Sequence, residues 1–197
     1  LHLLSRRQRQ MCIRDSYETD TLKDLYMYNM GNVILQVTQN CNLRCEYCVY
    51  SGSYINRVHT NKRMSFETAV KTIDFLAAHS LNCNEVSIGF YGGEPLLEIE
   101  LIKKAVSYAK EVFGEKKVNF NMTTNATLLN MDIADFLVQN DFNITISLDG
   151  PRNIHNKNRI FANSNKGTFD LIMENIALIR EKYPFFDKKI SFNAVID

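Results

Sequence analysis

Three cysteines lie within eight residues of this sequence, at Cys41, Cys45 and Cys48, directly after a short apolar run at residues 33–37. Three thiolates at this spacing can bind a metal centre and leave one of its coordination positions open. An open position permits chemistry, whereas a site closed by four protein ligands supports structure. The spacing therefore predicts a reactive metal centre that some other group completes.

Structural zinc is the alternative interpretation of these cysteines, with His59 or Cys83 as a fourth ligand. Structural zinc sites usually combine two pairs of cysteines at C-x2-C spacing, and the sequence has no second pair. Cys83 is better explained as a half-buried thiol in a turn, and His59 as a solvated loop residue. The cysteine motif therefore does not favour structural zinc.

The segments that must position this motif alternate between strand-like and helix-like patterns. β-Branched and apolar runs predict strands, and apolar residues at helical spacing predict helices between them. Such an alternation gives a parallel sheet with right-handed crossovers, either open and doubly wound or closed into a barrel. The expected strands are residues 33–38, 85–91, 117–124, 142–148 and 189–196. The first expected helix begins after the N-cap Ser65, and the second spans 96–113 with Gly114 as its C-cap. Two more helices are expected at 130–140 and 168–183, the last with Thr168 as its cap. Residues 152–166 are expected to form an irregular polar stretch.

Polar or glycine-rich clusters follow each of the first four expected strands. The carboxyl ends of parallel strands meet on one face of the sheet, where both architectures bind ligands. We therefore expect these clusters to form one site. They are the cysteine loop, Gly92-Gly93-Glu94-Pro95, Thr124-Asn125, and Ser147 with Asp149.

The residue types in this predicted site indicate what kind of ligand it could bind. Gly92 and Gly93 lack a Cβ atom, so a ligand can approach the strand backbone, and Glu94 adds a carboxylate suited to a protonated amine. Asn125 and Ser147 can donate or accept hydrogen bonds. Arg159 can pair with a carboxylate through two hydrogen bonds. A ligand that carries both an amine and a carboxylate, like an amino acid, fits this set.

The motif Cys41-x3-Cys45-x2-Cys48, with Tyr47 before the last cysteine, and the Gly92-Gly93-Glu94-Pro95 segment together resemble the radical S-adenosylmethionine (radical SAM) superfamily. Ser147-Leu148-Asp149-Gly150-Pro151, followed by His155 and Arg159, is similar to the branch that contains anaerobic sulfatase-maturating enzymes and peptide maturases with a SPASM domain. The resemblance covers residues 33–197. It implies an α/β fold, a partial (β/α)6 TIM-like barrel with parallel strands, truncated after the fifth strand, so that the radical SAM core domain at 33–197 is incomplete.

The resemblance also implies a reaction. Cys41, Cys45 and Cys48 would each bind one iron of a single 4Fe-4S cluster, and S-adenosylmethionine (AdoMet) would bind the fourth iron through its amine and carboxylate. The reduced cluster would pass an electron to the sulfonium, and the resulting 5′-deoxyadenosyl radical would abstract hydrogen from a peptide or protein substrate. A flavodoxin- or ferredoxin-like protein would supply the electron.

Roles in binding AdoMet follow from the resemblance, residue by residue. Tyr47 matches the position that contacts the adenine, and Gly92, Gly93 and Glu94 match the segment that holds the methionine amine. Ser147 and Arg159 match cofactor-binding positions of the sulfatase-maturating branch, and Asn125 is expected to bind the cofactor as well.

Two positions depart from the usual pattern of this branch, and two others have no assigned chemistry. Ala126 stands where Gly is frequent, and Asn156 stands where Asp is usual. Neither belongs to the cysteine motif, so both leave the substrate class open. Asp149 is interpreted as a turn residue before Gly150-Pro151. His155 is expected either to contact the substrate or to fix the loop in which it lies.

Residues 1–16 are expected to lie outside the native protein. Residues 6–16 resemble one translated frame of a transposon adapter used to prepare sequencing libraries, and the alternative is a genuine basic leader. Residues 17–32 would then be a lead-in to the first strand. Without residues 1–16 the chain loses four Arg and one Asp, so its net charge of +1 becomes slightly negative.

Composition limits the remaining classes of function. The 197 residues are 45% hydrophobic and 23% charged, which is enough for one core. The nearly neutral charge does not favour nucleic acid as a partner. The sequence shows no apolar stretch long enough to cross a bilayer and no secretory leader, so no membrane partner is expected. Cysteines that cluster rather than pair indicate a reducing, cytoplasmic environment.

The sequence therefore predicts a radical SAM enzyme that modifies a peptide or protein. Two other hypotheses stay open. The chain is a non-enzymatic iron–sulfur or zinc module, or it is an inactive fragment of the enzyme whose unclosed barrel exposes a strand edge. We expect the catalytic base, and the features that select the substrate, in the part of the barrel that this sequence lacks.

Overall fold

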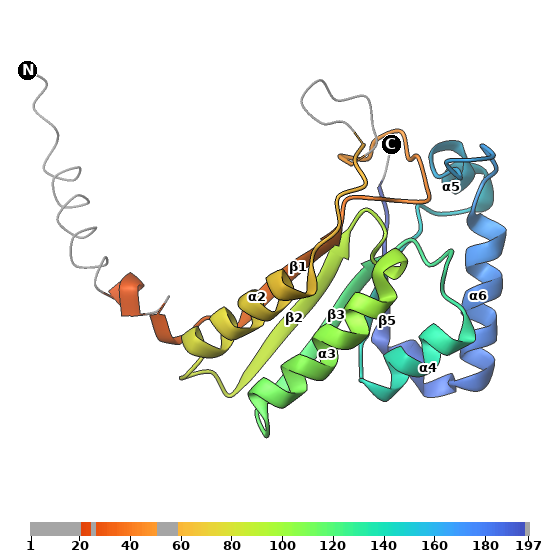
Figure 1. Ribbon diagram of the computed structural model, residues 1–197. Helices are drawn as coiled ribbons and strands as arrows, with labels where there is room; N and C mark the ends of the chain where they lie inside the picture. The colour runs from red at the N-terminus through yellow and green to blue at the C-terminus, as the bar shows by residue number, and fades with distance from the viewer. Residues whose placement is uncertain (1–20, 25–26, 51–58, 196–197) are drawn as a thin grey trace, which may run out of the picture.

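A computed structural model describes residues 21–24, 27–50 and 59–195 of the chain, so the expectation for residues 1–16 lies outside the described residues. The central element is one parallel sheet of five strands in the order β1-β2-β3-β4-β5 (Figure 1). Each strand pairs with the next one along the chain. The strands are β1 (Asn32–Thr38), β2 (Glu85–Gly92), β3 (Lys117–Thr124), β4 (Asn143–Ser147) and β5 (Ile190–Asn193).

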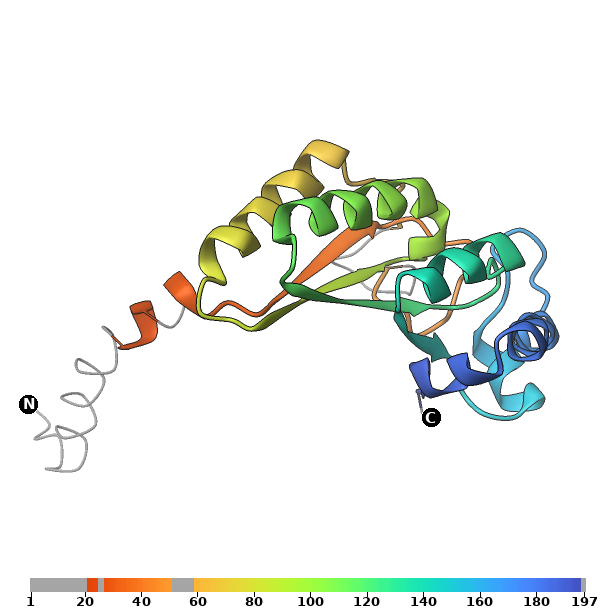
Figure 2. The same ribbon diagram turned by 90° about the horizontal axis from the view of Figure 1, so that it is seen from below.

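Helices form the crossovers between these parallel strands. Figures 1 and 2 show α2 and α3 side by side over one face of the sheet, and α4 packs against α6. This arrangement confirms the α/β fold with parallel strands that the alternating pattern predicts. The helices are α2 (Phe66–His79), α3 (Ile99–Phe113), α4 (Met131–Gln139), α5 (Arg152–Asn158) and α6 (Phe169–Lys182), and the 3-10 turns are η1 (Pro95–Glu98) and η2 (Pro184–Lys189).

The hydrophobic core lies between the sheet and its helices, because apolar side chains alternate along the strands. In β1, Leu35 is 1% exposed, whereas its neighbour Ile34, on the other face, is 65% exposed. Phe90, Phe120 and Phe142 stack across the sheet with ring centroids 5.4 to 6.4 Å apart. The face away from the helices is mixed, because Ile34 and Tyr91 line a cavity there together with Asn32, Ser87, Asn121, Thr123, Asn143 and Thr145.

Two of the predicted helix caps are confirmed. The Ser65 hydroxyl accepts a 3.2 Å hydrogen bond from the N–H of Thr68 at the start of α2. Gly114 ends α3 with φ +55° and donates its N–H to the carbonyl of Lys110 at 3.1 Å. Both caps satisfy backbone groups that a helix end leaves without an internal partner. The helices that carry the core are therefore bounded as their sequences indicate.

Several predicted boundaries are wrong. Residues 152–158 form α5 instead of an irregular stretch, and Thr168 precedes α6 without a capping hydrogen bond from its side chain. The helix expected from residue 96 begins as η1, because Pro95 starts a 3-10 turn before α3. The fifth strand is shorter than expected, because it begins at Ile190, after η2, and ends at Asn193.

Candidate metal and cofactor site

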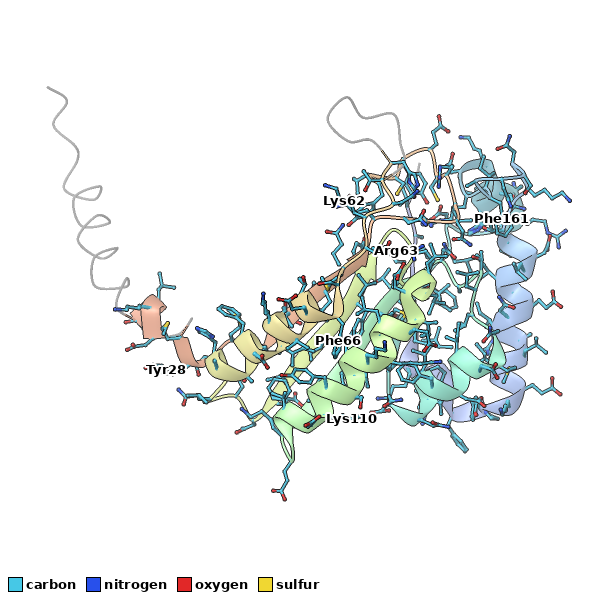
Figure 3. The ribbon with its side chains drawn as sticks, viewed as in Figure 1. Tyr28, Lys62, Arg63, Phe66, Lys110 and Phe161 are labelled. Carbon is cyan, nitrogen blue, oxygen red and sulfur yellow. The ribbon has the colours of Figure 1, made fainter. Side chains whose placement is uncertain are left out.

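One pocket at the carboxyl ends of the strands collects residues from several distant segments. Figure 3 shows Lys62, Arg63 and Phe161, which flank the cysteine loop, together at this end of the sheet. Among the described residues, Glu94 is the predicted site residue that does not line this pocket. The predicted site residues that do line it are Cys41, Cys45, Tyr47, Cys48, Gly92, Gly93, Asn125, Ser147 and Arg159.

The cysteine loop is held on two sides by backbone hydrogen bonds. The N–H of Gln39 donates to the carbonyl of Lys62 at 2.8 Å, and the N–H of Arg44 donates to the carbonyl of Ile160 at 2.9 Å. Leu43 is 1% exposed and anchors the loop in the protein. Segments that lie tens of residues apart in the sequence therefore fix the position of the cysteines.

The three thiols are free in this structure and lie in partly or fully buried surroundings. The sulfur of Cys41 accepts a 3.4 Å hydrogen bond from the N–H of Leu43, and the sulfur of Cys48 accepts one of the same length from Tyr50. Burial raises the pKa of Cys41 to about 12 and that of Cys45 to about 11. Without a metal these two thiols stay protonated, so metal binding must displace their protons.

The donor set fits a cluster of several irons better than one zinc ion. Within the described part of the chain, no group of three His, Cys, Asp or Glu side chains is arranged to hold a single metal ion. A 4Fe-4S cluster needs only one thiolate at each iron, so its three ligands do not have to meet at one point. Cys83, the proposed fourth zinc ligand, lies in the turn before β2 and packs against the core.

Gly92 and Gly93 bring the end of β2 against the start of the cysteine loop. The N–H of Gly93 donates to the carbonyl of Thr38 at 2.9 Å. A Cβ on Gly92 would lie 2.2 Å from the oxygen of Thr38, and a Cβ on Gly93 would lie 2.2 Å from the oxygen of Asn40. The close approach that the sequence predicts is therefore made by the chain's own backbone, and a ligand is not needed to explain the glycines.

Glu94 is completely buried and joins the ends of β2 and β3. Its Oε1 accepts hydrogen bonds from the Thr124 hydroxyl at 2.6 Å and from the N–H of Leu96 at 3.0 Å, and its Oε2 accepts one from the N–H of Asn125 at 2.7 Å. Burial raises the pKa of Glu94, while these hydrogen bonds act in the opposite direction. Both carboxylate oxygens are thus already bound by donors of the protein.

Asn125 belongs to a closed ring of side-chain hydrogen bonds beside the cysteine loop. Its Nδ2 donates to Oδ1 of Asn42 at 3.0 Å, and Nδ2 of Asn42 donates to the hydroxyl of Thr127 at 2.8 Å. The Thr127 hydroxyl then donates back to Oδ1 of Asn125 at 2.7 Å. Because Nδ2 of Asn125 also lies 3.8 Å from the sulfur of Cys41, the ring ties the end of β3 to the first cysteine.

Arg159 forms a buried ion pair with Asp149, and each residue is 8% exposed. Nε of Arg159 lies 2.8 Å from Oδ2 of Asp149, and Nη2 lies 3.1 Å from Oδ1. The third nitrogen, Nη1, lies 3.9 Å from the sulfur of Cys45. The guanidinium fork that was expected to bind a ligand carboxylate is thus used by the carboxylate of Asp149, two residues after the end of β4.

Asp149 accepts hydrogen bonds from three segments, so its interpretation as a turn residue is wrong. Besides Arg159, the hydroxyl of Tyr47 donates to Oδ2 and the N–H of Val195 donates to Oδ1 at 3.1 Å. Burial raises the pKa of Asp149, but these hydrogen bonds together hold it below its usual value. The Arg159 guanidinium also lies 5.4 Å from the ring centroid of Tyr47. Asp149 therefore orients both Tyr47 and Arg159.

His155 is completely buried and fixes the loop around this ion pair, which decides between its two predicted roles. Its Nδ1 accepts a 3.3 Å hydrogen bond from the N–H of Asp149. Its Nε2 then carries the proton and lies 2.8 Å from the hydroxyl of Thr168, which donates to the carbonyl of Arg159 at 3.3 Å. Burial, together with the nearby Arg159 charge, lowers the pKa of His155, so the ring is neutral.

Both departures from the family pattern have a structural explanation. Ala126 adopts a left-handed conformation, with φ +59°, which Gly adopts with less strain. Oδ1 of Asn156 accepts a 3.0 Å hydrogen bond from the N–H of Phe169 at the start of α6. An aspartate oxygen accepts the same bond, so Asn156 preserves the capping function. It also performs the role that the sequence assigns to Thr168.

Sequence reasoning did not foresee how four residues shape the site: it placed Thr124 and Asp149 at the strand ends without their partners, gave Thr168 only a helix cap, and omitted Thr127. Their short polar side chains are all buried and hydrogen-bonded to predicted site residues or to His155. Thr124 and Thr127 flank Asn125, so the Thr-Asn-x-Thr pattern at the end of β3 was an available signal. The partners of Asp149 and Thr168 are set by the folded chain.

Comparison with known proteins identifies the family. Residues 35–192 match the model of the radical SAM superfamily, and the chain therefore belongs to that superfamily. It is 38% identical over 157 residues to an uncharacterised protein of Methanocaldococcus jannaschii, covering 79% of this chain and 51% of that protein. It is 35% identical over 156 residues to the cysteine-type anaerobic sulfatase-maturating enzyme of Clostridium novyi, covering 78% of this chain and 41% of that enzyme.

Solved structures show the same relationship. Native anSMEcpe with bound AdoMet superposes with a TM-score of 0.69 at 29% identity, covering 83% of this chain and 43% of that chain. The same protein with AdoMet and the Cp18Cys peptide gives a TM-score of 0.67 at 28% identity. The five parallel strands thus correspond to a partial radical SAM barrel, as predicted. The chain spans about half, or less, of the length of the relatives it matches.

No helix within the described ranges is both long enough and apolar enough to cross a membrane.

Proposed function

We propose that this chain is the AdoMet-cleaving part of a radical SAM enzyme that modifies a peptide or protein. The observation that supports the proposal is the convergence of the predicted site residues. Residues from the cysteine loop and from the ends of β2, β3 and β4 line one pocket, together with Arg159. Helix packing alone does not require chemically distinctive residues at the carboxyl ends of consecutive strands.

In this proposal Cys41, Cys45 and Cys48 each bind one iron of a 4Fe-4S cluster. Three free thiols beside a pocket, with no fourth protein ligand among the described residues that line it, suit a cluster that keeps one iron open to a cofactor. When bound, the cluster supplies the electron that cleaves AdoMet reductively. The chain's part is to hold the thiolates, and Leu43 and the buried Cys45 exclude water from the inner side of the loop. A flavodoxin- or ferredoxin-like donor would supply electrons from outside.

AdoMet would lie across the same pocket. The ring of Tyr47 offers an aromatic face to the adenine, and Gly92 and Gly93 offer backbone groups to the methionine amine. Asn125 and the hydroxyl of Ser147 supply further polar contacts, and Nη1 of Arg159 is the guanidinium nitrogen that Asp149 does not bind. Glu94 would support the pocket without lining it, because its carboxylate accepts a hydrogen bond from the backbone N–H of Asn125.

A peptide substrate suits the hydrogen-bonding groups on the inner face of the sheet. Parallel barrels usually fill their interior with apolar side chains, whereas Asn, Ser and Thr side chains line this one beside Ile34 and Tyr91. Nδ2 of Asn121 donates to the Ser87 hydroxyl at 2.7 Å, and Nδ2 of Asn143 lies 3.3 Å from Oδ1 of Asn121. Amide side chains of this kind can exchange hydrogen bonds with the backbone of a peptide. The similarity to a peptide-bound maturase structure supports the same substrate class.

The proposal is tested with the full-length protein, reconstituted with iron and sulfide under anaerobic conditions. We expect the reduced protein to convert AdoMet to 5′-deoxyadenosine, and the Cys45→Ala variant to lose this activity together with iron. Cys83→Ser is the matched control, since Cys83 lies in a turn away from the pocket, and it should retain both. Undiminished cleavage in Cys45→Ala would contradict the proposal. A protein that binds iron or zinc but does not respond to AdoMet would support the non-enzymatic module instead.

A further inference from the structure

The ion pair between Asp149 and Arg159 has a feature that its contribution to holding the loops in place does not explain. Two nitrogens of the guanidinium bind Asp149, and the remaining terminal nitrogen, Nη1, is directed at the sulfur of Cys45 at 3.9 Å. The side chains of Arg159 and Asp149 are 9% and 2% exposed, so the surrounding water screens this contact weakly. A buried cation therefore faces one of the three predicted cluster ligands.

Asp149 keeps the guanidinium in this orientation. It receives hydrogen bonds from Tyr47 and from the backbone of Val195, so its carboxylate cannot easily rotate. His155 accepts the N–H of Asp149 and reaches the carbonyl of Arg159 through Thr168. The backbone of each partner of the ion pair is thus fixed as well, and the pair has one well-defined geometry.

Hydrogen bonds and positive charge at a ligating sulfur stabilise the reduced form of an iron–sulfur cluster, because reduction adds negative charge there. We propose that Arg159, positioned by Asp149, donates Nη1–H to the Cys45 thiolate and thereby sets how readily the cluster is reduced. This inference rests on the proposed function, since it needs the cluster at Cys45. It gives Asp149 a role as a positioning residue for a reaction that it does not touch.

The geometry matters as well as the charge. A guanidinium can bind a carboxylate with two nitrogens and still present a third to the sulfur, whereas a lysine ammonium is a single point of charge on a flexible stem. A lysine at position 159 can pair with Asp149 but cannot hold both partners in this way. The Lys variant therefore separates a positioned hydrogen bond from a merely nearby cation.

The test is the midpoint potential of the reconstituted cluster in the full-length protein, measured by EPR-monitored titration without AdoMet. We expect Arg159→Gln to disfavour reduction at least tenfold, which lowers the potential by about 59 mV for a one-electron couple. Arg159→Lys should shift it in the same direction by a smaller amount. Arg180→Gln is the matched control, because Arg180 forms an exposed ion pair with Asp187 and should leave the potential unchanged.

Three outcomes would overturn the inference. One is an unchanged potential in Arg159→Gln with a fully loaded cluster. The second is a Lys variant identical to the wild type while the Gln variant is shifted, because charge alone would then account for the effect. The third is loss of the cluster from both variants with unchanged circular dichroism, which would make the pair a purely structural support of the loop. Formation of 5′-deoxyadenosine by the wild-type protein after AdoMet is added reports separately on the proposed function.

Discussion

The hydroxyl of Thr124 donates a 2.6 Å hydrogen bond to the buried carboxylate of Glu94, and this contact joins the ends of two neighbouring strands. The same hydroxyl accepts the N–H of Ala126 at 3.0 Å, so one side chain connects Glu94 to the turn that follows β3. The acidic residue of the Gly-Gly-Glu segment is therefore a brace between strands. Its effect on the pocket passes through the backbone of Asn125, which it holds in place.

The first prediction concerns this brace. In Glu94→Gln the new amide group presents hydrogens to donors that need an acceptor, so one buried polar group loses its partner. We expect a loss of about 1–3 kcal/mol in the free energy of unfolding, measured with urea. The control is Glu67→Gln on the surface of α2, which removes an exposed pair with Lys71 and should cost less than about 0.5 kcal/mol. Equal stability of the two variants would contradict the claim that Glu94 stabilises the junction of β2 and β3.

The second prediction concerns the close approach of β2 to the cysteine loop. A Cβ on Gly93 would lie 2.2 Å from the carbonyl oxygen of Asn40, and backbone atoms cannot move aside as a side chain can. We expect Gly93→Ala to destabilise the protein by about 1–3 kcal/mol in thermal or urea unfolding. Gly31→Ala is the control, because the nearest atom to its new Cβ is the sulfur of Cys83 at 3.9 Å. A Gly93→Ala variant as stable as Gly31→Ala would show that the contact is not required.

The third prediction concerns acid stability. Folding lowers the pKa of His155 from its ordinary value of 6.5. At a pH just below 6.5 the histidine therefore binds more protons in the unfolded chain than in the folded protein. The free energy of unfolding should therefore fall as the pH drops through about 6.5. In His155→Asn this dependence should disappear between pH 7 and 5, whereas replacing the half-buried His79 should preserve it. Asp149 has a lowered pKa, so its contribution is lost only at still lower pH.

The fourth prediction concerns the helix start at Phe169. Asn156→Asp keeps the oxygen that accepts the N–H of Phe169 and adds a negative charge at the N-terminus of α6. We expect a gain of about 0–1 kcal/mol in the free energy of unfolding. Asn156→Ala removes the acceptor and should lose about 1 kcal/mol. If the Asp variant is less stable than the Ala variant, Asn156 does not act as a cap.

The sequence predicts the fold well because its signals are local. β-Branched and apolar runs mark the five strands, and Ser65 and Gly114 mark helix ends through hydrogen bonds within a few residues. Helix α5 has no such signal, since its seven residues are mostly polar and only His155 is buried. That helix is stabilised by the contacts of His155 with Asp149 and Thr168, which no local pattern reveals.

The candidate site, like the fold, could be predicted only in part. Parallel strands bring their ends together, so the membership of the pocket follows from the order of the elements. The hydrogen-bond partners of the residues in and around the pocket do not follow from that order. An Asp-Gly-Pro sequence is typical of a turn, and nothing in it indicates that Asp149 receives Arg159 ten residues later and Tyr47 from the cysteine loop. Glycines at 92 and 93 indicate a close approach, but the sequence does not say that the approaching group is the protein's own backbone.

The hydrogen bond from Val195 to Asp149 has a consequence for the order of events during synthesis. Asp149 follows Tyr47 by 102 residues, and Val195 follows Asp149 by a further 46. A ribosome that adds roughly 5–20 residues per second needs roughly 7–30 s to cover that distance. The cysteines thus leave the ribosome well before their surroundings are complete. We expect iron loading to follow the docking of β5.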